Sequence, residues 1–342
     1  MEKGSFTRQE IYSQPDAWSA ALSVLDGYKR AIVDLHPARG YSQIIFTGCG
    51  STYYLSLTAA SLTQELTGLP TRAFPASELW LSPRSCYVDG KTLLIAVSRS
   101  GETSETLHAC EAFLAHEQGD LLTFSCYEAM PLAKLGRLNI VLPSGQERSV
   151  AQTRAFSTLH LGTLVAALTW AGRNDLLGFL PRLVEMGRQL LDNYSDLAAE
   201  LGRDESIDRF YMLGSASRYG LACELSLKMK EMSLSHSEAF HFMEFRHGPK
   251  SMITPESLVI GLRSTVNARQ EAAVLDDIKT LGGRVLDIAE TGADIRFETN
   301  MDEVIRNVLY LPVGQMIAFE RSLYKGLDPD HPTNLDAVVK LS

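Results

Sequence analysis

Residues 92–106 read TLLIAVSRSGETSET, and this stretch decides the fold. A continuous apolar run over residues 92–97 stops at a glycine loop rich in hydroxyl side chains, and a helical pattern follows over residues 102–117. A buried strand, a short turn and an amphipathic helix make up half of a parallel βαβ unit. The stretch therefore predicts an α/β protein with a parallel sheet.

Similar patterns extend this prediction along the chain. Apolar, β-branched runs predict further strands at residues 44–46, 121–124, 138–142, 210–213, 257–262 and 284–288. A helical pattern follows the first of these strands at residues 51–66, and another without any strand fills residues 162–202. The most apolar window, LGTLVAALTWAG at residues 161–172, is too short to span a bilayer and predicts a buried helix.

The two halves of the chain repeat one plan. IIFTGCGSTYYLSLTAASL aligns with FYMLGSASRYGLACELSLK and places Gly48 opposite Gly214, an offset of 166 residues. The next strands end at Val97 and Leu262, an offset of 165 residues. Two matching offsets indicate a duplicated α/β domain, although chance similarity among βαβ units is the alternative. The predicted segments are an N-terminal segment 1–25, a first domain 26–175, a helical linker 176–201, a second domain 202–330 and a C-terminal tail 331–342.

Composition excludes several classes of protein. The formal net charge is -9 and no lysine or arginine run is present, so a nucleic-acid partner is not expected. The polar N-terminus is unlike a secretory signal, and no membrane association is expected. Five cysteines without a CxxC pair fit reduced thiols in the cytoplasm. The eight histidines show no metal-binding spacing, so we expect no metal.

Two hydroxyl-bearing turns are candidates for binding a phosphate. In parallel sheets, ligands bind at the carboxyl ends of strands, where helix N-termini offer free N–H groups. Such turns follow two neighbouring strands and contribute Ser51, Thr52, Ser98, Ser100, Gly101 and Thr103. The competing interpretation is an ordinary helix cap, because serine or threonine before glutamate is a common capping pattern. Neither turn has the pattern of a nucleoside triphosphate loop.

The second half carries candidate reactive groups instead. Its counterpart loop, RSTVNARQE, lacks the Ser-x-Ser-Gly arrangement, and its first helix continues through LSLKMKEMSLSHSEAF. Glu224, Lys228 and Glu231 share one face of that helix, which is either a solvated charged face or a reactive cluster. In EFRHGPKS, Glu244 and His247 precede a Gly-Pro turn, so His247 is expected to be exposed.

These motifs together resemble a known family. GCGST, SRSGET, SVAQTRAF, LSLKMKE, EFRHGPKS and HPTNL occur in the order found in the double sugar-isomerase (SIS) proteins. The chain is similar to the isomerase half of glucosamine-6-phosphate synthase. It is still more similar to stand-alone aminosugar-phosphate deaminases, deglycases and galactosamine/tagatose-phosphate isomerases. The resemblance runs from about Ile11 to the tail.

The resemblance implies two tandem flavodoxin-like, three-layer αβα domains that bind a sugar 6-phosphate without any cofactor. Glu231 matches the base that moves a proton between C1 and C2, and His247 matches a ring-opening histidine that reaches across a homodimer into a shared active site. A glutamate and a histidine divide the proton transfers of triosephosphate isomerase in the same way. The positions that match substrate or phosphate contacts are Ser51, Thr52, Ser98, Arg99, Ser100, Gly101, Thr103, Val150, Gln152 and Lys228.

The chain departs from the synthase pattern at three places. The synthase has a glutaminase domain with cysteine after the initiator methionine, whereas Glu2 stands here, so we expect no glutaminase activity and an amine-releasing reaction. Ala337 occupies the position of a tail lysine, for which Lys340 is a candidate substitute. Arg99 replaces a glutamine, as in the galactosamine/tagatose relatives.

The predicted function is that of a phosphosugar isomerase and deaminase acting on a hexosamine or ketose 6-phosphate. The alternatives are a fructosamine-type 6-phosphate deglycase and a sensor that binds sugar phosphate without chemistry.

Overall fold

The computed structural model describes residues 2–36, 38 and 40–341. These residues form two compact units, each assembled from separate stretches of the chain. The N-unit comprises residues 13–147, 154–184 and those from Asp336 onward, and the C-unit comprises residues up to Tyr12, 148–153 and 185–335. The boundaries predicted above run consecutively along the chain and stay a prediction, whereas both units draw on segments that are distant in sequence.

Each unit is built around one parallel sheet. The N-unit contains α2 (Gln14–Asp26), α3 (Lys29–Asp34), β1 (Tyr41–Gly48), α4 (Ser51–Thr67), β2 (Thr71–Pro75), α5 (Ala76–Leu81), α6 (Pro83–Cys86), β3 (Lys91–Ser98), α7 (Ser104–Ala115), β4 (Gly119–Ser125), η1 (Pro131–Lys134), β5 (Leu138–Val141), η2 (Pro143–Gly145), α8 (Arg154–Trp170) and α9 (Asn174–Leu177). Helix α10 (Arg182–Asn193) begins in the N-unit and ends in the C-unit.

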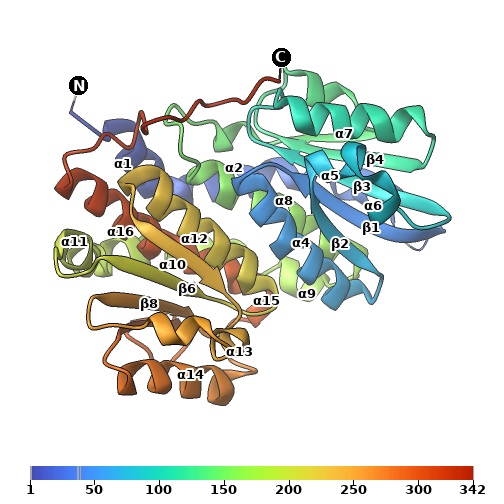
Figure 1. The fold of residues 1–342 in the computed structure, drawn as a ribbon. Helices are drawn as coiled ribbons and strands as arrows, with labels where there is room; N and C mark the ends of the chain where they lie inside the picture. Colours follow the sequence, from blue (N-terminus) through green and yellow to red (C-terminus); the bar gives the residue numbers. More distant parts are fainter. Residues whose placement is uncertain (1, 37, 39, 342) are drawn as a thin grey trace. The chain divides into compact units, whose positions relative to one another are not determined.

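The C-unit has the same plan. It contains α1 (Ser5–Tyr12), α11 (Ser195–Arg203), β6 (Arg209–Leu213), α12 (Ser217–Ser233), β7 (His236–Phe240), α13 (Phe242–Phe245), η3 (Pro249–Met252), β8 (Ser257–Leu262), α14 (Ala268–Thr280), β9 (Arg284–Ala289), β10 (Ile295–Arg296), α15 (Glu303–Arg306), η4 (Asn307–Tyr310) and α16 (Leu311–Tyr324). Within this unit α12 lies on one side of the sheet and α14 on the other (Figure 1).

The duplication is confirmed by the topology. The strand order is β2-β1-β3-β4-β5 in one sheet and β7-β6-β8-β9-β10, read in the same sense, in the other. All pairings are parallel. Helices bury a hydrophobic cluster against each sheet. In the N-unit, α5 and α7 cover a cluster that includes Ile45 and Leu94. In the C-unit, α13 and α14 cover one that includes Tyr211 and Val259. The predicted α/β fold of two tandem domains is therefore correct.

The turns before α4 and α12 have nearly the same backbone angles. Gly50 precedes α4 with φ 54° and ψ −124°, and Ala216 precedes α12 with φ 51° and ψ −127°. Gly48 and Gly214 come two residues earlier, and a Cβ on either would lie within 3 Å of the following helix. A positive φ costs an alanine energy that a glycine avoids, so the first copy has the relaxed version of the turn.

The structure corrects one predicted element. The helix predicted to run through SLSHSEAF ends at Ser233, and Leu234 has the left-handed conformation, with φ 48°. The following residues form β7, an edge strand. The polar and small residues of β7 are predicted from the sequence to continue the helix. In the structure, parallel pairing with β6 holds this segment in an extended conformation. The other predicted strands are present, and so is the helical region 162–202.

Candidate functional site

Two hydroxyl-bearing turns lie at the carboxyl edge of the N-unit sheet. Strands β1 and β3 are adjacent and parallel, with Thr47 opposite Ala96, so the turns that follow them emerge side by side. The strand order reverses between these two strands, because β2 flanks one and β4 the other. Such a switch point is where open α/β sheets bind their ligands. A contact of 3.5 Å between Cys49 Sγ and Thr106 Oγ1 links the turn after β1 to α7.

The turn after β3 is shaped by its own hydroxyl groups. Ser98 Oγ accepts a hydrogen bond from the Gly101 N–H at 3.1 Å, and Ser100 Oγ lies 3.4 Å from Thr103 Oγ1. Gly101 has φ 72°, a left-handed conformation that favours glycine. The Glu102 N–H also donates to Ser100 Oγ at 3.3 Å, so the loop is wrapped around its serines.

The turn after β1 closes more tightly. Thr52 Oγ1 accepts from the Cys49 N–H at 3.0 Å and donates to the Cys49 carbonyl at 2.9 Å. Ser51 begins α4 and is 5% exposed. The structure thus brings five predicted hydroxyl groups to one edge of one sheet, although Thr52 already has local partners.

Arg99 has contacts that the sequence did not indicate. Its side chain is 7% exposed, with Nη1 3.3 Å from a carboxylate oxygen of the fully buried Glu147. Nη2 donates to the Ala337 carbonyl at 3.2 Å. Glu147 in turn accepts from the Ala155 N–H at the start of α8, at 3.1 Å. Arg99 therefore ties the loop to α8 and to the C-terminal tail.

The tail lies along the start of α7. The Ser104 N–H donates to the Val339 carbonyl at 3.3 Å, and the Leu341 N–H donates to Ser104 Oγ at 3.1 Å. Lys340, the candidate substitute for the tail lysine, has Nζ 3.3 Å from Glu102 Oε2. Because 68% of the Lys340 side chain is exposed, this ion pair contributes little stability. Its partner Glu102 belongs to the turn after β3, and its tail neighbours Val339 and Leu341 contact Ser104 at the start of α7.

The candidate reactive cluster lies on α12 of the C-unit. Lys228 Nζ is 3.2 Å from Glu224 Oε1 and 2.5 Å from Glu231 Oε2. The side chains of Lys228 and Glu224 are fully buried, whereas 19% of Glu231 is exposed. The interpretation as a solvated charged face is therefore wrong. The predicted shared face is correct, and only its Glu231 end is open to solvent.

The charge state of Lys228 limits what each residue does. Burial alone would lower the pKa of the ammonium, but the Glu224 and Glu231 carboxylates outweigh it and raise the pKa above its ordinary value. Lys228 is consequently a cation at neutral pH and cannot act as a base. Its full burial fits a group that positions Glu231.

His247 is exposed, as predicted, but the chain separates it from Glu231. Glu231 precedes β7, whereas His247 follows both β7 and α13. Among the described residues, no hydrogen bond or ion pair joins Glu231 to His247 within one chain, and Glu231 is paired with Lys228 instead.

The predicted sugar-lining loop is held by two buried acidic residues that the sequence analysis missed. Glu10 Oε1 accepts from the Arg148 N–H at 2.6 Å, and its side chain is 3% exposed. The Asp330 carbonyl accepts from the Val150 N–H at 3.2 Å, while its carboxylate accepts from the Thr7 N–H at 2.7 Å. Both partners are remote in sequence, so no local signal could reveal them.

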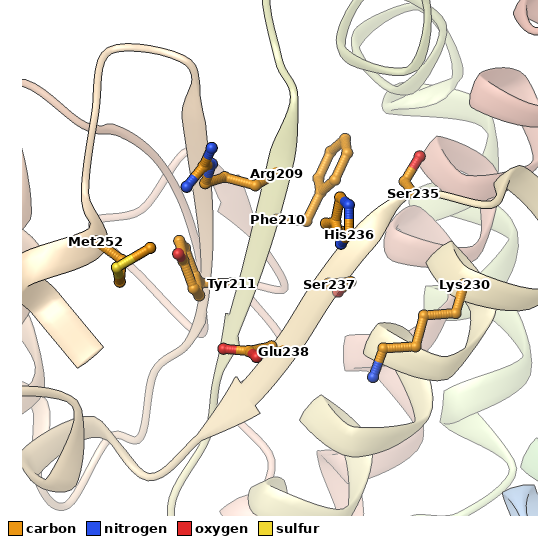
Figure 2. A pocket seen from close by; sticks show the side chains of 9 residues that line it. All are labelled: Arg209, Phe210, Tyr211, Lys230, Ser235, His236, Ser237, Glu238 and Met252. Atoms are coloured by element: carbon orange, nitrogen blue, oxygen red, sulfur yellow. The ribbon is translucent and has the colours of Figure 1, made fainter. Parts of the chain in front are cut away.

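Gln152 and the hollow beside β7 complete the polar features. Gln152 Oε1 is buried and has no hydrogen-bond partner among the residues that the structure describes. A hollow of about 600 Å³ opens along β6 and β7. The residues that line it include Arg209, Tyr211, Lys230 and Glu238 (Figure 2). Ion pairing with Asp208 already occupies Arg209, so the hollow has mixed charge.

In the described part of the chain, no helix is both long and apolar enough to cross a membrane. Groups of three or more potential metal-ligating side chains are likewise absent from these residues.

The SIS domain family model matches residues 39–168 and 205–308, which is one match in each half of the chain. The chain belongs to the SIS domain family. It is 26% identical, over 99% of its length, to the isomerising glutamine–fructose-6-phosphate aminotransferase of Methanothermobacter thermautotrophicus, and 30% identical, over 97%, to that of Helicobacter pylori. It spans only 58% and 59% of those two proteins.

Two solved structures share the fold over almost the whole chain. Glucosamine-6-phosphate deaminase from Thermotoga maritima is 26% identical, with a TM-score of 0.80, and the alignment covers 98% of this chain and 100% of that one. Tagatose-6-phosphate ketose/aldose isomerase from Escherichia coli is 24% identical, with a TM-score of 0.86 over 96% of this chain and 95% of that one. The second likeness concerns the fold alone.

Proposed function

We propose that this SIS protein is a phosphosugar isomerase that releases the amino group of a hexosamine 6-phosphate as ammonia, leaving a ketose 6-phosphate. The observation that carries the proposal is Glu231, a partly exposed carboxylate that a fully buried lysine ammonium holds in place. A base fixed in one orientation by an ion pair suits abstraction of a carbon-bound proton, because positioning is a large part of such catalysis.

The chemistry balances with the side chains of the chain and one water molecule. Glu231 takes the proton from C2 of the open-chain aldehyde and returns it to C1, while one proton of the amine passes to the C1 oxygen, so C2 becomes an imine and C1 an alcohol. Water then adds to C2, and the nitrogen leaves as ammonia, which gives the ketose. The electrons move from C2 to C1 within the substrate, and no oxidant or reductant is consumed.

The N-unit supports the phosphate part of the proposal. Ser98, Ser100 and Thr103 surround the turn that leads into α7, at the switch point of the sheet. The unpaired N–H groups and positive dipole end of a helix favour an anion there. In this proposal the loop supplies binding energy for the phosphate group of the substrate.

Two findings support release of the amino group and assembly into a homodimer. The Thermotoga maritima relative is a glucosamine-6-phosphate deaminase, and this chain covers that whole protein. No described hydrogen bond or ion pair joins His247 to Glu231 within one chain, which fits an active site in which a second copy of the chain supplies the histidine. We therefore propose a homodimer with shared sites.

A substrate panel tests the proposal. Purified protein is mixed with glucosamine, galactosamine and fructosamine-type 6-phosphates, and ammonia and ketose phosphate are measured together. We expect ammonia and ketose in equal amounts from a hexosamine 6-phosphate, and none with Glu231→Gln. Release of an amino acid from a fructosamine 6-phosphate alone would identify a deglycase. Tight binding without any product would identify a sensor, and either result overturns the deaminase proposal.

A further inference from the structure

The C-unit has a counterpart of the phosphate loop, and its position is equivalent. Residues 263–267 connect β8 to α14, as the SRSGET loop connects β3 to α7. The two loops occupy the same place in the two sheets, at the reversal of strand order between β6 and β8 in one and between β1 and β3 in the other. In this loop the Asn267 N–H donates to Ser264 Oγ at 3.1 Å, which repeats the serine turn of the first loop.

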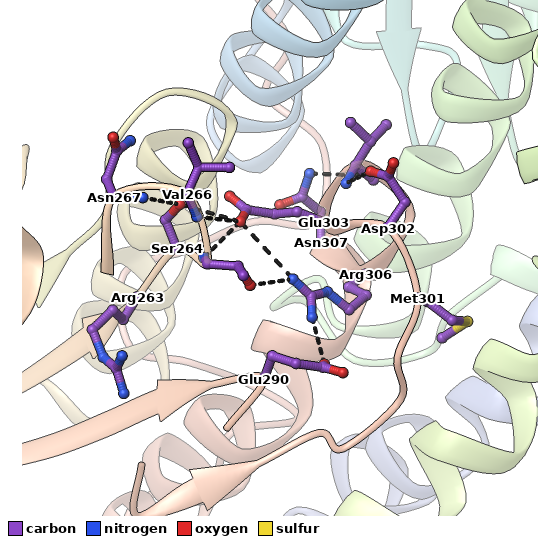
Figure 3. A network of polar contacts seen from close by, with 12 residues as sticks. Arg263, Ser264, Val266, Asn267, Glu290, Met301, Asp302, Glu303, Arg306 and Asn307 are labelled. Atoms are coloured by element: carbon purple, nitrogen blue, oxygen red, sulfur yellow. Dashed lines mark hydrogen bonds and ion pairs between the residues drawn. The ribbon is translucent and has the colours of Figure 1, made fainter. Parts of the chain in front are cut away.

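A carboxylate of the chain itself occupies this second loop. Glu303 Oε2 accepts from the Thr265 N–H at 2.6 Å, from Ser264 Oγ at 3.1 Å and from the Val266 N–H at 3.4 Å (Figure 3). Two successive backbone N–H groups and a hydroxyl directed at one oxygen form the concave donor set that proteins use for phosphate and other anions. Here the anion is delivered by α15, a helix that follows β10.

Two buried arginines complete the surroundings of Glu303. Arg218 Nη1 pairs with Glu303 Oε1, and Arg306 Nη2 lies 3.9 Å from Oε2. Both arginine side chains are 3% exposed. Arg218 follows the Ala216 turn and is the repeat equivalent of Thr52 in the first half. The second half therefore has a cation directed at this carboxylate where the first half has a hydroxyl group.

The charges are distributed so that Glu303 stays ionised. Arg218 also contacts Glu271 at 3.4 Å, and Arg306 contacts Glu290 at 2.5 Å. Burial alone would raise the pKa of Glu303, but Arg218 and the donors of the loop outweigh it and lower the pKa. Glu303 is thus the anion shared by both arginines, while each arginine has a carboxylate of its own.

We propose that Glu303 is a built-in anion that fills the second phosphate-type loop, so that this loop is closed to external phosphate and the chain offers one exchangeable anion site of this type. The second loop keeps the donors of an anion site and has the ligand attached covalently. The proposal does not depend on which reaction the protein catalyses.

An ordinary ion-pair network makes a different prediction from a filled anion site. In a network, removing the glutamate leaves buried arginines that no small ion replaces. In a filled site, removal leaves a cavity with convergent donors, and inorganic phosphate or sulfate takes the place of the carboxylate. Recovery of stability by an added anion therefore separates the two interpretations.

The experiment measures Tm for Glu303→Ala as inorganic phosphate is raised, with chloride at matched ionic strength as the reference. Ser100→Ala and Thr103→Ala are included in every protein, so that phosphate binding at the first loop does not contribute to the change in Tm. We expect a phosphate-dependent rise of several degrees in Glu303→Ala that is absent in the same protein with Glu303 intact. Glu256→Ala removes an exposed glutamate of the same unit and serves as the control.

Equal phosphate responses with and without Glu303 would overturn the proposal. A variant that folds only in phosphate would support it strongly. If Glu303→Ala folds under neither condition, the same phosphate titration on Glu303→Ser decides, since the shorter side chain is uncharged and leaves room beside Arg218. A phosphate-dependent rise in Tm then supports the built-in anion, and a Tm that does not respond to phosphate overturns it.

Discussion

Acidification should destabilise the N-unit through His160, a fully buried side chain on α8. Neither ring nitrogen has a hydrogen-bond partner among the described residues, and burial lowers the pKa of the imidazole from 6.5 to about 4. In the unfolded chain the pKa returns to its ordinary value, so the unfolded state binds a proton first as the pH falls. The stability is fully present above pH 6.5 and is lost as the pH falls towards 4.

The size of the effect follows from the two pKa values. Because each pKa unit corresponds to about 1.4 kcal/mol, the full loss below pH 4 is about 3.4 kcal/mol. Linkage between pH 7.5 and pH 5 gives a loss of about 2 kcal/mol from this residue. His160→Leu removes the titration and also the two buried nitrogens, so its stability should change less over the same interval.

Tryptophan fluorescence isolates the measurement, because Trp18, Trp80 and Trp170 all lie in the N-unit. Urea unfolding at pH 7.5 and pH 5 should show a larger loss for the parent than for His160→Leu, by about 2 kcal/mol. His116→Gln, at an exposed histidine on the surface of the same unit, should behave as the parent does. Equal losses in the parent and in His160→Leu would show that His160 is not the acid-sensitive group.

The remaining predictions concern the proposed reaction. Glu231→Gln should keep sugar-phosphate binding but lower kcat by roughly a hundredfold to ten-thousandfold, and exchange of the C2 hydrogen with deuterated water should stop in parallel; exchange at the parent rate would move the base elsewhere. Ser100→Ala with Thr103→Ala should weaken binding by roughly 1.5–3 kcal/mol for each lost charged hydrogen bond, measured by calorimetry, and unchanged affinity would place the anchor elsewhere. Mixing Glu231→Gln and His247→Ala proteins with subunit exchange should restore about a quarter of the parent activity, because half of the dimers are mixed and each has one complete site; a fully active monomer in sedimentation would contradict shared sites.

Most of the fold was predictable because its central strands are continuous apolar runs. β1, β3, β4, β6 and β8 are largely buried on both faces, and such strands appear in sequence as continuous apolar runs. The strands that the sequence did not predict are β2, β7 and β10, all at sheet edges. Their polar residues carry little periodicity, and only pairing with a neighbour makes them strands.

The candidate site was predictable only where its contacts are local. The serine turn and the α12 cluster join residues three or four apart, so spacing alone indicates them. The pairing of Arg218 with Glu303 spans 85 residues, and the contact of Arg99 with the tail spans 238. Contacts of this kind form only because the fold places distant segments next to each other, and no local pattern in the sequence indicates them.

The way the C-unit is assembled has a consequence for recombination between related genes. Its three segments are joined by Glu10, which fixes residues 148–149, and by Asp330, which fixes both Thr7 and Val150. A chimera made with one crossover in the middle of the chain would pair α1 and the 148–153 loop of one parent with the Asp330 region of the other. Chimeras that carry these three segments from the same parent should therefore survive more often, even though they need several crossovers.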